Sequence, residues 1–506
     1  MMAEASKDSK ERLVRNVDNN LSFIESLLPD MQKCIHLIDS IRKRENSSNL
    51  FLDSLAVCED ILLGSYVVIY DIMASLKRMI KTDNVYIKRY QMSSLNLCFF
   101  EACSLFVDSG GGQSGILNKL ESSAKSLNLV GEQFLIRHIV GDIDSFSAKY
   151  CQNSALRDLF RHYDDPIKMY EAYVKLNDED VFAKGVSEMM AYFLEIRVVC
   201  DHFLQTLVPF SERPDSIGTV DSKSVKSTIS ELFNTCIADA LRKKNAHKII
   251  EDTVIQGTKE IDKLYKDYSF CEKAKKFLSD SLHCEDMSPF DAVEDLIRIR
   301  MMAEFMRMDI GCAMFAYLES STDMERAQSL RHIQITKQAA LTHLYGYTDN
   351  TRQCSLWNKI VKAVERDNVR IDSESLHEQF KKMTADLKTD ARQSNIYAHY
   401  RYRDDFYVSA RLDAYSKMNQ MSVIYETLPL LNLVKEISQY SLRILDAIAK
   451  RQKDKRIRSI MKINDMFAEL DNIISKSNVS ADGKHQMKGM VDKLKCSIEA
   501  VVDGIG

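Results

Sequence analysis

The chain has 506 residues, a hydrophobic fraction of 45% and a formal net charge of −4. This length gives room for two or three domains with a sizeable core. The nearly balanced charge excludes a strong overall attraction to nucleic acid or to an anionic membrane, so any such contact must come from a local patch of charge.

The composition favours helices joined by short connections, because only six prolines and 16 glycines occur. Twelve cysteines stand singly without a CxxC pair, which is typical of reduced thiols in a cytosolic protein. The N-terminus lacks the apolar stretch of a signal peptide, and the most apolar run, at 60–76, is shorter than the roughly 20 residues that span a bilayer. We therefore expect a cytoplasmic protein without membrane contact, metal or cofactor.

Apolar residues recur three and four positions apart along most of the chain, which predicts helices, for example at 21–28, 54–73, 188–207 and 441–449. Pro29 is expected to end or kink the first helix. The glycine-rich stretch 108–115 predicts a loop, 210–224 is the best candidate linker, and Ser288 before a proline predicts a helix start. Lone histidines such as His138 and His202, in apolar helical contexts, are expected to be packing residues.

The strongest organisational signal is a repeat at an offset of about 240 residues. Identical pairs at an offset of 240 are Asn118/Asn358, Lys119/Lys359, Asp164/Asp404 and Asp165/Asp405. Further pairs at an offset of 242 are Ala172/Ala414, Tyr173/Tyr415, Lys175/Lys417 and Asn177/Asn419. A two-residue insertion explains the change of offset, and the ordered series predicts two homologous helical domains in an all-α protein.

We expect the two domains at 49–212 and 286–450. An N-terminal helical segment (1–48), a linker with a helical connector (213–285) and a C-terminal helical tail (451–506) flank them. Two like domains in one chain favour a pseudo-twofold pair, the single-chain analogue of an isologous dimer. Sites on one domain would then face their counterparts across the seam.

Both repeats carry an arginine, a histidine and an acidic pair in the same order. The stretch SALRDLFRHYDD contains Arg157 and His162 with four residues between them, and ARQSNIYAHYRYRDD contains Arg392 and His399 with six between them. A separation of seven is close to two helical turns, so the second pair shares one face of a helix.

The first pair needs a bend. Arg157 and His162 are about 140° apart on an ideal helix and converge only if that helix ends or bends near the motif. The acidic residues and Pro166 that follow favour such an end. Arg161 is an alternative arginine for this motif.

RNA cleavage without a metal needs groups of these types. A base takes the proton of the 2′-hydroxyl, a cation stabilises the charge on the phosphate oxygens, and an acid protonates the leaving 5′-oxygen. Histidine suits proton transfer because its unperturbed pKa is about 6.5. Arginine suits the phosphate because its planar fork stays charged and gives two directed hydrogen bonds.

The Arg-x4-His and Arg-x6-His pairs, each within a helical domain, resemble the Arg-x4–6-His motif of the HEPN domain superfamily. The resemblance implies paired helical bundles and, in active members, a metal-independent endoribonuclease of toxin–antitoxin, CRISPR or antiviral defence systems. It implies catalytic roles for Arg157, His162, Arg392 and His399. RNA is then the expected partner, with a regulatory protein partner as a further possibility.

Positive and aromatic residues around the motifs are candidates for RNA binding. Arg401 and Arg403 alternate with Tyr400 and a second tyrosine, and cations beside aromatic rings are suited to single-stranded nucleic acid. Arg161 joins this set in the first motif. The basic stretch 450–462 offers further charge that could steer RNA, or simply forms a solvated helix face.

Alternatives stay open. The offset between the two histidines is 399 − 162 = 237, so either a gap restores the register of the repeat or one motif is a coincidence. Each motif could equally be a salt-bridged cluster at a helix end. The runner-up function is a non-catalytic HEPN-like scaffold that binds protein or nucleotide, and a third is a structural helical repeat protein.

Overall fold

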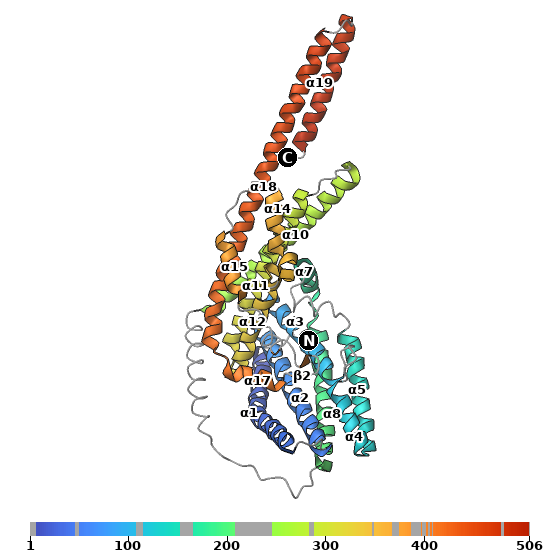
Figure 1. Cartoon of the computed structure of the whole chain (residues 1–506), viewed down its shortest axis with the longest axis vertical. Coiled ribbons are helices and arrows are strands. Elements are labelled where there is room, and N and C mark those ends of the chain that lie inside the picture. The colour runs from blue at the N-terminus through green and yellow to red at the C-terminus, as the bar shows by residue number, and fades with distance from the viewer. Residues whose placement is uncertain are drawn as a thin grey trace. The chain divides into compact units, whose positions relative to one another are not determined.

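The computed structural model describes residues 7–45, 50–107, 115–151, 165–207, 245–282, 288–346, 349–366, 374–385, 396, 401–402, 405–406, 408–476 and 480–504. Apart from one pair of two-residue strands, these residues form helices and short connections (Figure 1). The expectation of an all-α protein is confirmed. The chain divides into two compact units, residues 1–363 with 372–439 and residues 364–371 with 440–506.

The first part of the chain folds around α2. Its helices are α1 (Lys7–Glu45), α2 (Leu50–Lys81), α3 (Val85–Phe106), α4 (Ile116–Ser126), α5 (Val130–Tyr150), α7 (Pro166–Lys175) and α8 (Glu179–Leu207). Helix α2 packs against α1, α3, α4 and α8, and α5 lies between α4 and α8 (Figure 1). Because neighbours cover α2 on most sides, its sequence is almost continuously apolar, as expected for a buried helix.

The second part repeats this order. Its elements are α10 (Ala246–Leu282), α11 (Ser288–Glu319), α12 (Asp323–Leu344), α13 (Asp349–Cys354), α14 (Leu356–Arg366), α15 (Glu374–Ala385), β1 (Arg401–Tyr402), β2 (Asp405–Phe406), α17 (Val408–Lys417), α18 (Gln420–Lys476) and α19 (Ala481–Gly504). Helix α10 packs on α11, and α11 packs on α12. The strands β1 and β2 are antiparallel, with Arg401 opposite Phe406 and Tyr402 opposite Asp405.

Four pairs of helices at equivalent places have equal lengths. Helices α2 and α11 have 32 residues each, α3 and α12 have 22, α4 and α14 have 11, and α7 and α17 have 10. Their first residues differ by 238, 238, 240 and 242. Helices α1 and α10, with 39 and 37 residues, extend the series to the N-terminal segment and the connector. The N-terminal segment and the connector therefore carry long helices of similar length.

Helices of one part pack on helices of the other in a reciprocal way. Helix α7 contacts α11 and α10, whereas its counterpart α17 contacts α2. Val408 and Leu412 of α17 belong to the apolar core built around α2. Gln32 on α1 donates to Asp413 of α17 at 2.6 Å, and Tyr170 on α7 donates to Asp262 of α10 at 2.8 Å. Each part thus completes the packing of the other.

Polar caps start the equivalent helices. The Asn84 side chain accepts hydrogen bonds from the amides of Tyr86 and Ile87 at the start of α3, and Thr322 accepts from the amide of Glu325 at the start of α12. These side chains satisfy amides that have no partner within their helix. Asp165 caps α7 in the same way, with Pro166 as its first residue.

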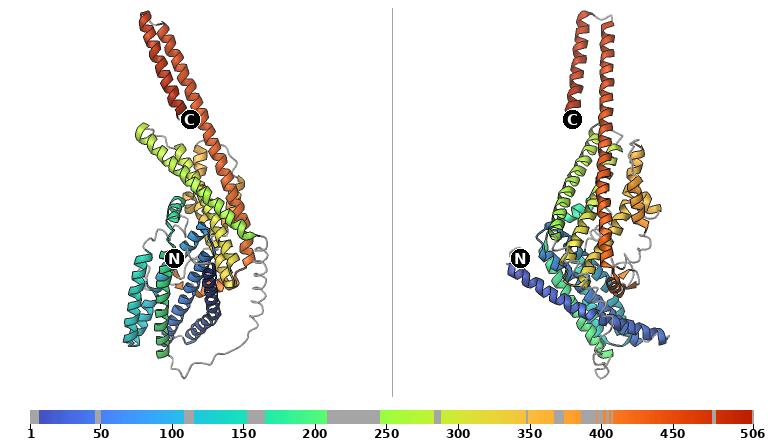
Figure 2. Two further views of the ribbon diagram at one scale, coloured as in Figure 1. Left: turned by 180° about the vertical axis from the view of Figure 1, so that it is seen from behind. Right: turned by 90° about the vertical axis from the view of Figure 1, so that its left-hand side faces the viewer.

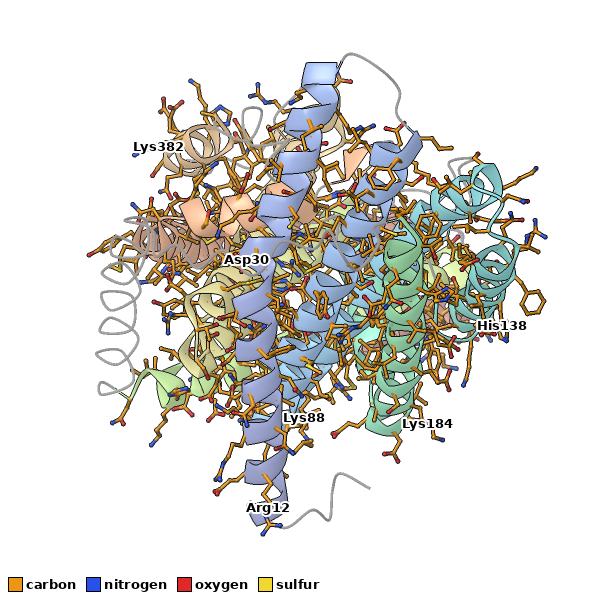
Figure 3. The ribbon with its side chains drawn as sticks, turned by 90° about the horizontal axis from the view of Figure 1, so that it is seen from below. Arg12, Asp30, Lys88, His138, Lys184 and Lys382 are labelled. Carbon is orange, nitrogen blue, oxygen red and sulfur yellow. The ribbon has the colours of Figure 1, made fainter. Side chains whose placement is uncertain are left out.

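Two local expectations need correction. Of the two outcomes expected at Pro29, the helix end is wrong: Pro29 lies inside α1, whose buried Leu21, Ile24 and Leu28 pack on the core and offset the lost hydrogen bond. His138 and His202 do not pack in the interior. Their side chains are 61% and 63% exposed and lie 2.8 Å from Asp142 and Glu132, and Figure 3 shows His138 on the outer side of α5.

The second unit contains the last part of α18 and α19. Figures 1 and 2 show α19 running back beside this part of α18. The ammonium of Lys484 donates to the carbonyl of Ser475 at 2.8 Å and joins the two helices near their turn. Ile474 is buried, whereas Met466, Ile473 and Met490 are exposed.

Among the helices that the structure describes, none combines the length and the hydropathy needed to cross a membrane. Within the same residues, no cluster of three or more His, Cys, Asp or Glu side chains could hold a metal ion.

Candidate functional site

Three charged side chains of α2 lie in the interior of the protein. Asp71, Lys77 and Arg78 are at most 1% exposed. Burial of a charge costs several kcal/mol unless an opposite charge and hydrogen bonds compensate it. The partners come mainly from α12, so these residues join the two repeated parts of the chain.

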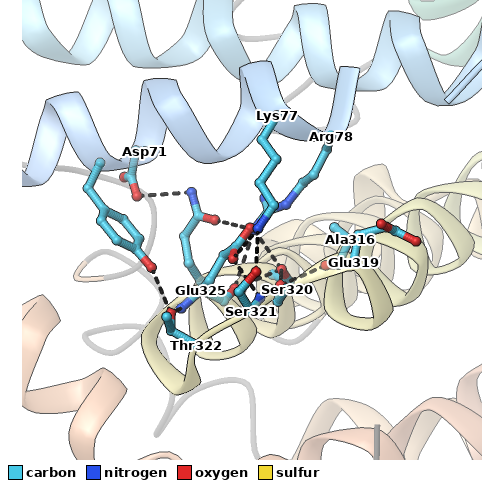
Figure 4. Close-up of polar contacts among 12 residues, drawn as sticks. Asp71, Lys77, Arg78, Ala316, Glu319, Ser320, Ser321, Thr322 and Glu325 are labelled. Atoms are coloured by element: carbon cyan, nitrogen blue, oxygen red, sulfur yellow. Dashed lines mark hydrogen bonds and ion pairs between the residues drawn. The ribbon is translucent and has the colours of Figure 1, made fainter. Parts of the chain in front are cut away.

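The Lys77–Arg78 end of this network holds the turn between α11 and α12 (Figure 4). The ammonium of Lys77 lies 2.8 Å from Glu325 and 2.5 Å from Asp18. Arg78 donates to Gln328 at 2.6 Å and to Ser329 at 2.8 Å. The Glu325 oxygen that Lys77 contacts, Oε2, also accepts a hydrogen bond from the backbone amide of Ser321 at 2.8 Å. The turn is therefore fixed from α2.

The Asp71 end reaches α17. The Asp71 carboxylate accepts from Gln328 at 3.0 Å, from Arg331 at 3.0 Å and from Arg411 at 3.2 Å. Arg331 also donates to the hydroxyl of Tyr415 at 2.6 Å. One buried carboxylate of the first part thus binds two guanidinium groups of the second, a charge-assisted arrangement that is directional as well as strong.

One histidine lies close to the arginines of this network. Burial lowers the pKa of His332 well below its ordinary value, and the nearby Arg331, Arg78 and Arg411 lower it further. Burial also raises the pKa of the Tyr415 hydroxyl. His332 is therefore a neutral side chain, and its ring packs edge-on against Tyr90 with the centroids 6.0 Å apart.

The repeat places a second aspartate at the equivalent position, but with different partners. Asp309 on α11 corresponds to Asp71 at an offset of 238. The hydroxyl of Tyr86 donates to Asp309 at 3.4 Å, and the ring of Tyr86 stacks on Tyr173 with the centroids 4.7 Å apart. The position that corresponds to Arg411 at an offset of 242 is occupied by Met169. Among the described contacts, the carboxylate bound by two arginines is the one of Asp71.

Most residues predicted from the sequence to form the site lie outside the described residues. These are Arg157, Arg161, His162, Arg392, His399, Tyr400 and Arg403. Arg401 is described as the first residue of β1, which packs against α3. The roles assigned to all of these residues stay predictions.

Described residues at the edges of the two motif segments show how each segment is held. Asp165 caps α7 directly after the first motif and forms an ion pair of 3.6 Å with Arg298 of α11. Ile396, within the second motif, accepts a hydrogen bond of 3.1 Å from Arg411, which is bound to Asp71 of α2. Arg89 of α3 donates to the carbonyls of Leu176 and Val174 at the end of α7. A charged residue of the opposite part thus reaches each segment, directly where Arg298 pairs with Asp165 and indirectly where Asp71 holds Arg411, which donates to Ile396.

The helix ends account for the offset between the two histidines. The last residues of α5 and α15 differ by 385 − 150 = 235, and the first residues of α7 and α17 differ by 408 − 166 = 242. The histidine offset of 237 lies between these values. The strands β1 and β2, at 401–406, immediately follow the second motif and occupy the region of the extra residues. The flanking helices leave room for a gap in this region, and the equivalence of the two motifs stays a prediction.

The sequence reasoning missed the buried network. The signal was present, because Asp71, Lys77 and Arg78 interrupt an apolar run that must be covered on most sides. The partners were not predictable, since Glu325, Gln328 and the arginines lie about 250 to 340 residues away. The network is too deeply buried to bind a substrate, so its chemical role is to hold the surrounding segments.

No protein-family model, curated protein or solved structure matches this chain.

Proposed function

We propose that this chain is a metal-independent endoribonuclease of the HEPN type, in which the two repeated parts form one composite site. The catalytic groups are Arg157 and His162 of the first motif and Arg392 and His399 of the second. The observation that carries the proposal is that a charged residue of the opposite part reaches each motif segment: Arg298 pairs with Asp165, and Asp71 reaches Ile396 through Arg411.

The duplicated helix order supports a composite site. Two segments at equivalent places in a pseudo-twofold pair approach the same seam when each part packs on the other. Helix α7 follows the first motif and packs on α11, while α17 follows the second and packs on α2. The histidine offset of 237, between the flanking offsets of 235 and 242, supports equivalent places for the two motifs.

The chemistry proceeds by attack of the neighbouring 2′-hydroxyl. One neutral histidine takes the 2′-hydroxyl proton, the 2′-oxygen bonds to phosphorus, and the bond from phosphorus to the 5′-oxygen breaks. The other histidine, protonated, gives its proton to that 5′-oxygen. The products are a 2′,3′-cyclic phosphate and a free 5′-hydroxyl, while the two arginines stabilise the charge on the phosphate oxygens.

RNA binding is assigned to the positive and aromatic residues around the motifs. Arg401 begins β1, and Arg403 and Tyr400 are adjacent to this strand in the sequence. Arg161 contributes from the first motif. Arginine beside tyrosine suits a single-stranded substrate, because the guanidinium group binds the phosphate and the ring stacks on a base. A ribonuclease of this kind needs restraint, so a defence or toxin system with a regulatory partner follows by analogy.

The experiment is incubation of the purified full chain with mixed RNA in EDTA. The native protein is expected to produce fragments that end in a 2′,3′-cyclic phosphate, and His162→Ala and His399→Ala are each expected to reduce the rate by about 100-fold or more. A His36→Ala/His485→Ala variant, which removes two exposed histidines far from the motifs in sequence, is the matched control.

The outcomes separate the candidate functions. A loss with only one histidine variant would assign the activity to one motif rather than to a composite site. A native protein that leaves RNA intact, with or without magnesium, would contradict the ribonuclease and favour the non-catalytic HEPN-like scaffold.

A further inference from the structure

We propose that Asp71, acting through Arg411, is a positioning residue for the segment that carries Arg392 and His399. This inference rests on the proposed function, since it assigns that segment a catalytic role. Asp71 belongs to the first repeated part and the segment to the second. The first part would therefore set the geometry of the second part's catalytic groups.

The contact is a bridge made by a single guanidinium group. Nε of Arg411 donates to the carbonyl oxygen of Ile396 at 3.1 Å, and Nη1 of the same group donates to Asp71 Oδ2 at 3.2 Å. Ile396 lies four residues after Arg392 and three before His399. A planar fork can direct two donors at two acceptors at once, which fixes the distance between the carbonyl and the carboxylate.

Burial makes the bridge rigid. Asp71 is fully buried and Arg411 is 1% exposed. Gln328 and Arg331 donate to the same carboxylate, so Asp71 is held from several directions. A charge in this position cannot exchange its partners for water without a large penalty. The carbonyl of Ile396 is therefore tied to the most firmly held carboxylate of the network.

The bridge also explains an asymmetry of the repeat. At the place that corresponds to Arg411 the first part has Met169, and the equivalent aspartate, Asp309, binds Tyr86 instead. The first motif segment is fastened through Asp165 and Arg298. The bridge from Asp71 reaches Ile396 of the second motif segment, so its loss is expected to act on that segment.

The sharpest variant is Arg411→Lys. Lysine keeps the positive charge beside Asp71 but has one ammonium group, which cannot reproduce the directed fork to both acceptors. Asp71→Asn tests the other end of the bridge by removing the negative charge. Asp71→Glu keeps the carboxylate, so its defect should be smaller than that of Asp71→Asn. The control is Glu260→Gln, which removes the charge from the ion pair between Glu260 and Arg300 on α10 and α11.

Two measurements on the full chain test the proposal. Hydrogen–deuterium exchange reports directly on the peptide 391–407, independently of any activity. Arg411→Lys and Asp71→Asn are expected to speed exchange in this peptide while peptides from α5 and α8 stay unchanged. In RNA cleavage, kcat is expected to fall about 10- to 100-fold with KM nearly constant, because misplacement of a catalytic group weakens the chemical step.

The outcomes distinguish this inference from the proposed function. Unchanged exchange at 391–407 in both variants would overturn the positioning role, whatever the activity. Faster exchange throughout the protein would also overturn it, since the residues would then serve general stability. If exchange becomes faster only at 391–407 but the native protein never cleaves RNA, the bridge holds the segment and the proposed ribonuclease function is wrong.

Discussion

Asp60 is a carboxyl group that the fold keeps partly away from water. Burial raises the pKa of Asp60 to about 6, and the nearby Asp39 adds to the shift. An acid with a raised pKa binds its proton more readily in the folded state than in the unfolded state. The free energy of unfolding therefore falls as the pH rises from about 4 to about 6, and the penalty is complete above that range.

Asp60→Asn is expected to stabilise the protein at neutral pH because it removes this penalty. The gain in the free energy of unfolding should reach up to about 3 kcal/mol at pH 7.5, since each pKa unit is worth about 1.4 kcal/mol. Urea denaturation at pH 7.5 and at pH 4 measures it, with the exposed Asp267→Asn as control. An equal gain at both pH values would contradict the assignment.

His332 gives a dependence of the opposite sign. Its pKa is lowered well below the ordinary value by burial and by Arg331, Arg78 and Arg411. Below pH about 6.5 the unfolded chain binds a proton at this histidine and the folded chain does not. The free energy of unfolding therefore falls as the pH falls below that value.

His332→Gln should weaken the decline in stability on the acid side. Between pH 7.5 and 5.5 the native protein should lose about 1.4 kcal/mol more of its free energy of unfolding than the variant does. Denaturant titrations at the two pH values provide the comparison. Parallel pH curves for the two proteins would contradict the lowered pKa of His332 in the folded state.

Glycines show how individual helices tolerate change. A Cβ added at Gly115, which precedes α4, would lie 1.8 Å from the carbonyl oxygen of Val107, so the backbone must move. A Cβ added at Gly141, inside α5, would meet nothing within 4 Å. The same substitution therefore has opposite expected effects at the two places.

Gly115→Ala is expected to destabilise the protein by about 1–3 kcal/mol through this overlap. Gly141→Ala is expected to stabilise it by up to about 1 kcal/mol, because alanine favours the helical conformation more than glycine does. Thermal denaturation of the two variants side by side measures both effects. Similar shifts for both would contradict the close approach of Gly115 to Val107.

At the scale of elements, periodicity predicted the long helices well and their details poorly. The apolar run at 60–76 lies within the buried helix α2, as expected. Pro29 was misjudged because tertiary packing of α1 outweighs one lost hydrogen bond. The strands β1 and β2 were not predicted, since two residues per strand are too few for an alternating pattern.

For the whole molecule, the reciprocal packing implies that neither repeated part is complete alone. Val408 and Leu412 of α17 fill the core around α2, and α7 packs on α11. When residues 1–212 and 213–506 are produced as two chains, we expect them to co-purify when expressed together. Each alone should unfold at a lower denaturant concentration. Two separately stable chains that do not associate would contradict this expectation.

The repeat could be predicted from the sequence because paired identities at 240 and 242 survive along the chain. The register of the motifs could not, because it depends on helix ends and on the position of β1 and β2. The contacts between Asp71 and its arginines could not be predicted either, since residues hundreds of positions apart meet only after folding. The roles of the motif residues remain predictions, because these residues, apart from Arg401, lie outside the described ones.

The central claim is that the two motif segments meet at one seam between the repeated parts. A photocrosslinking residue in place of His162, followed by mass spectrometry of the irradiated full chain, tests it without any need for activity. The account predicts crosslinks to residues within 391–407 of the same chain. Crosslinks confined to 115–207 would contradict it.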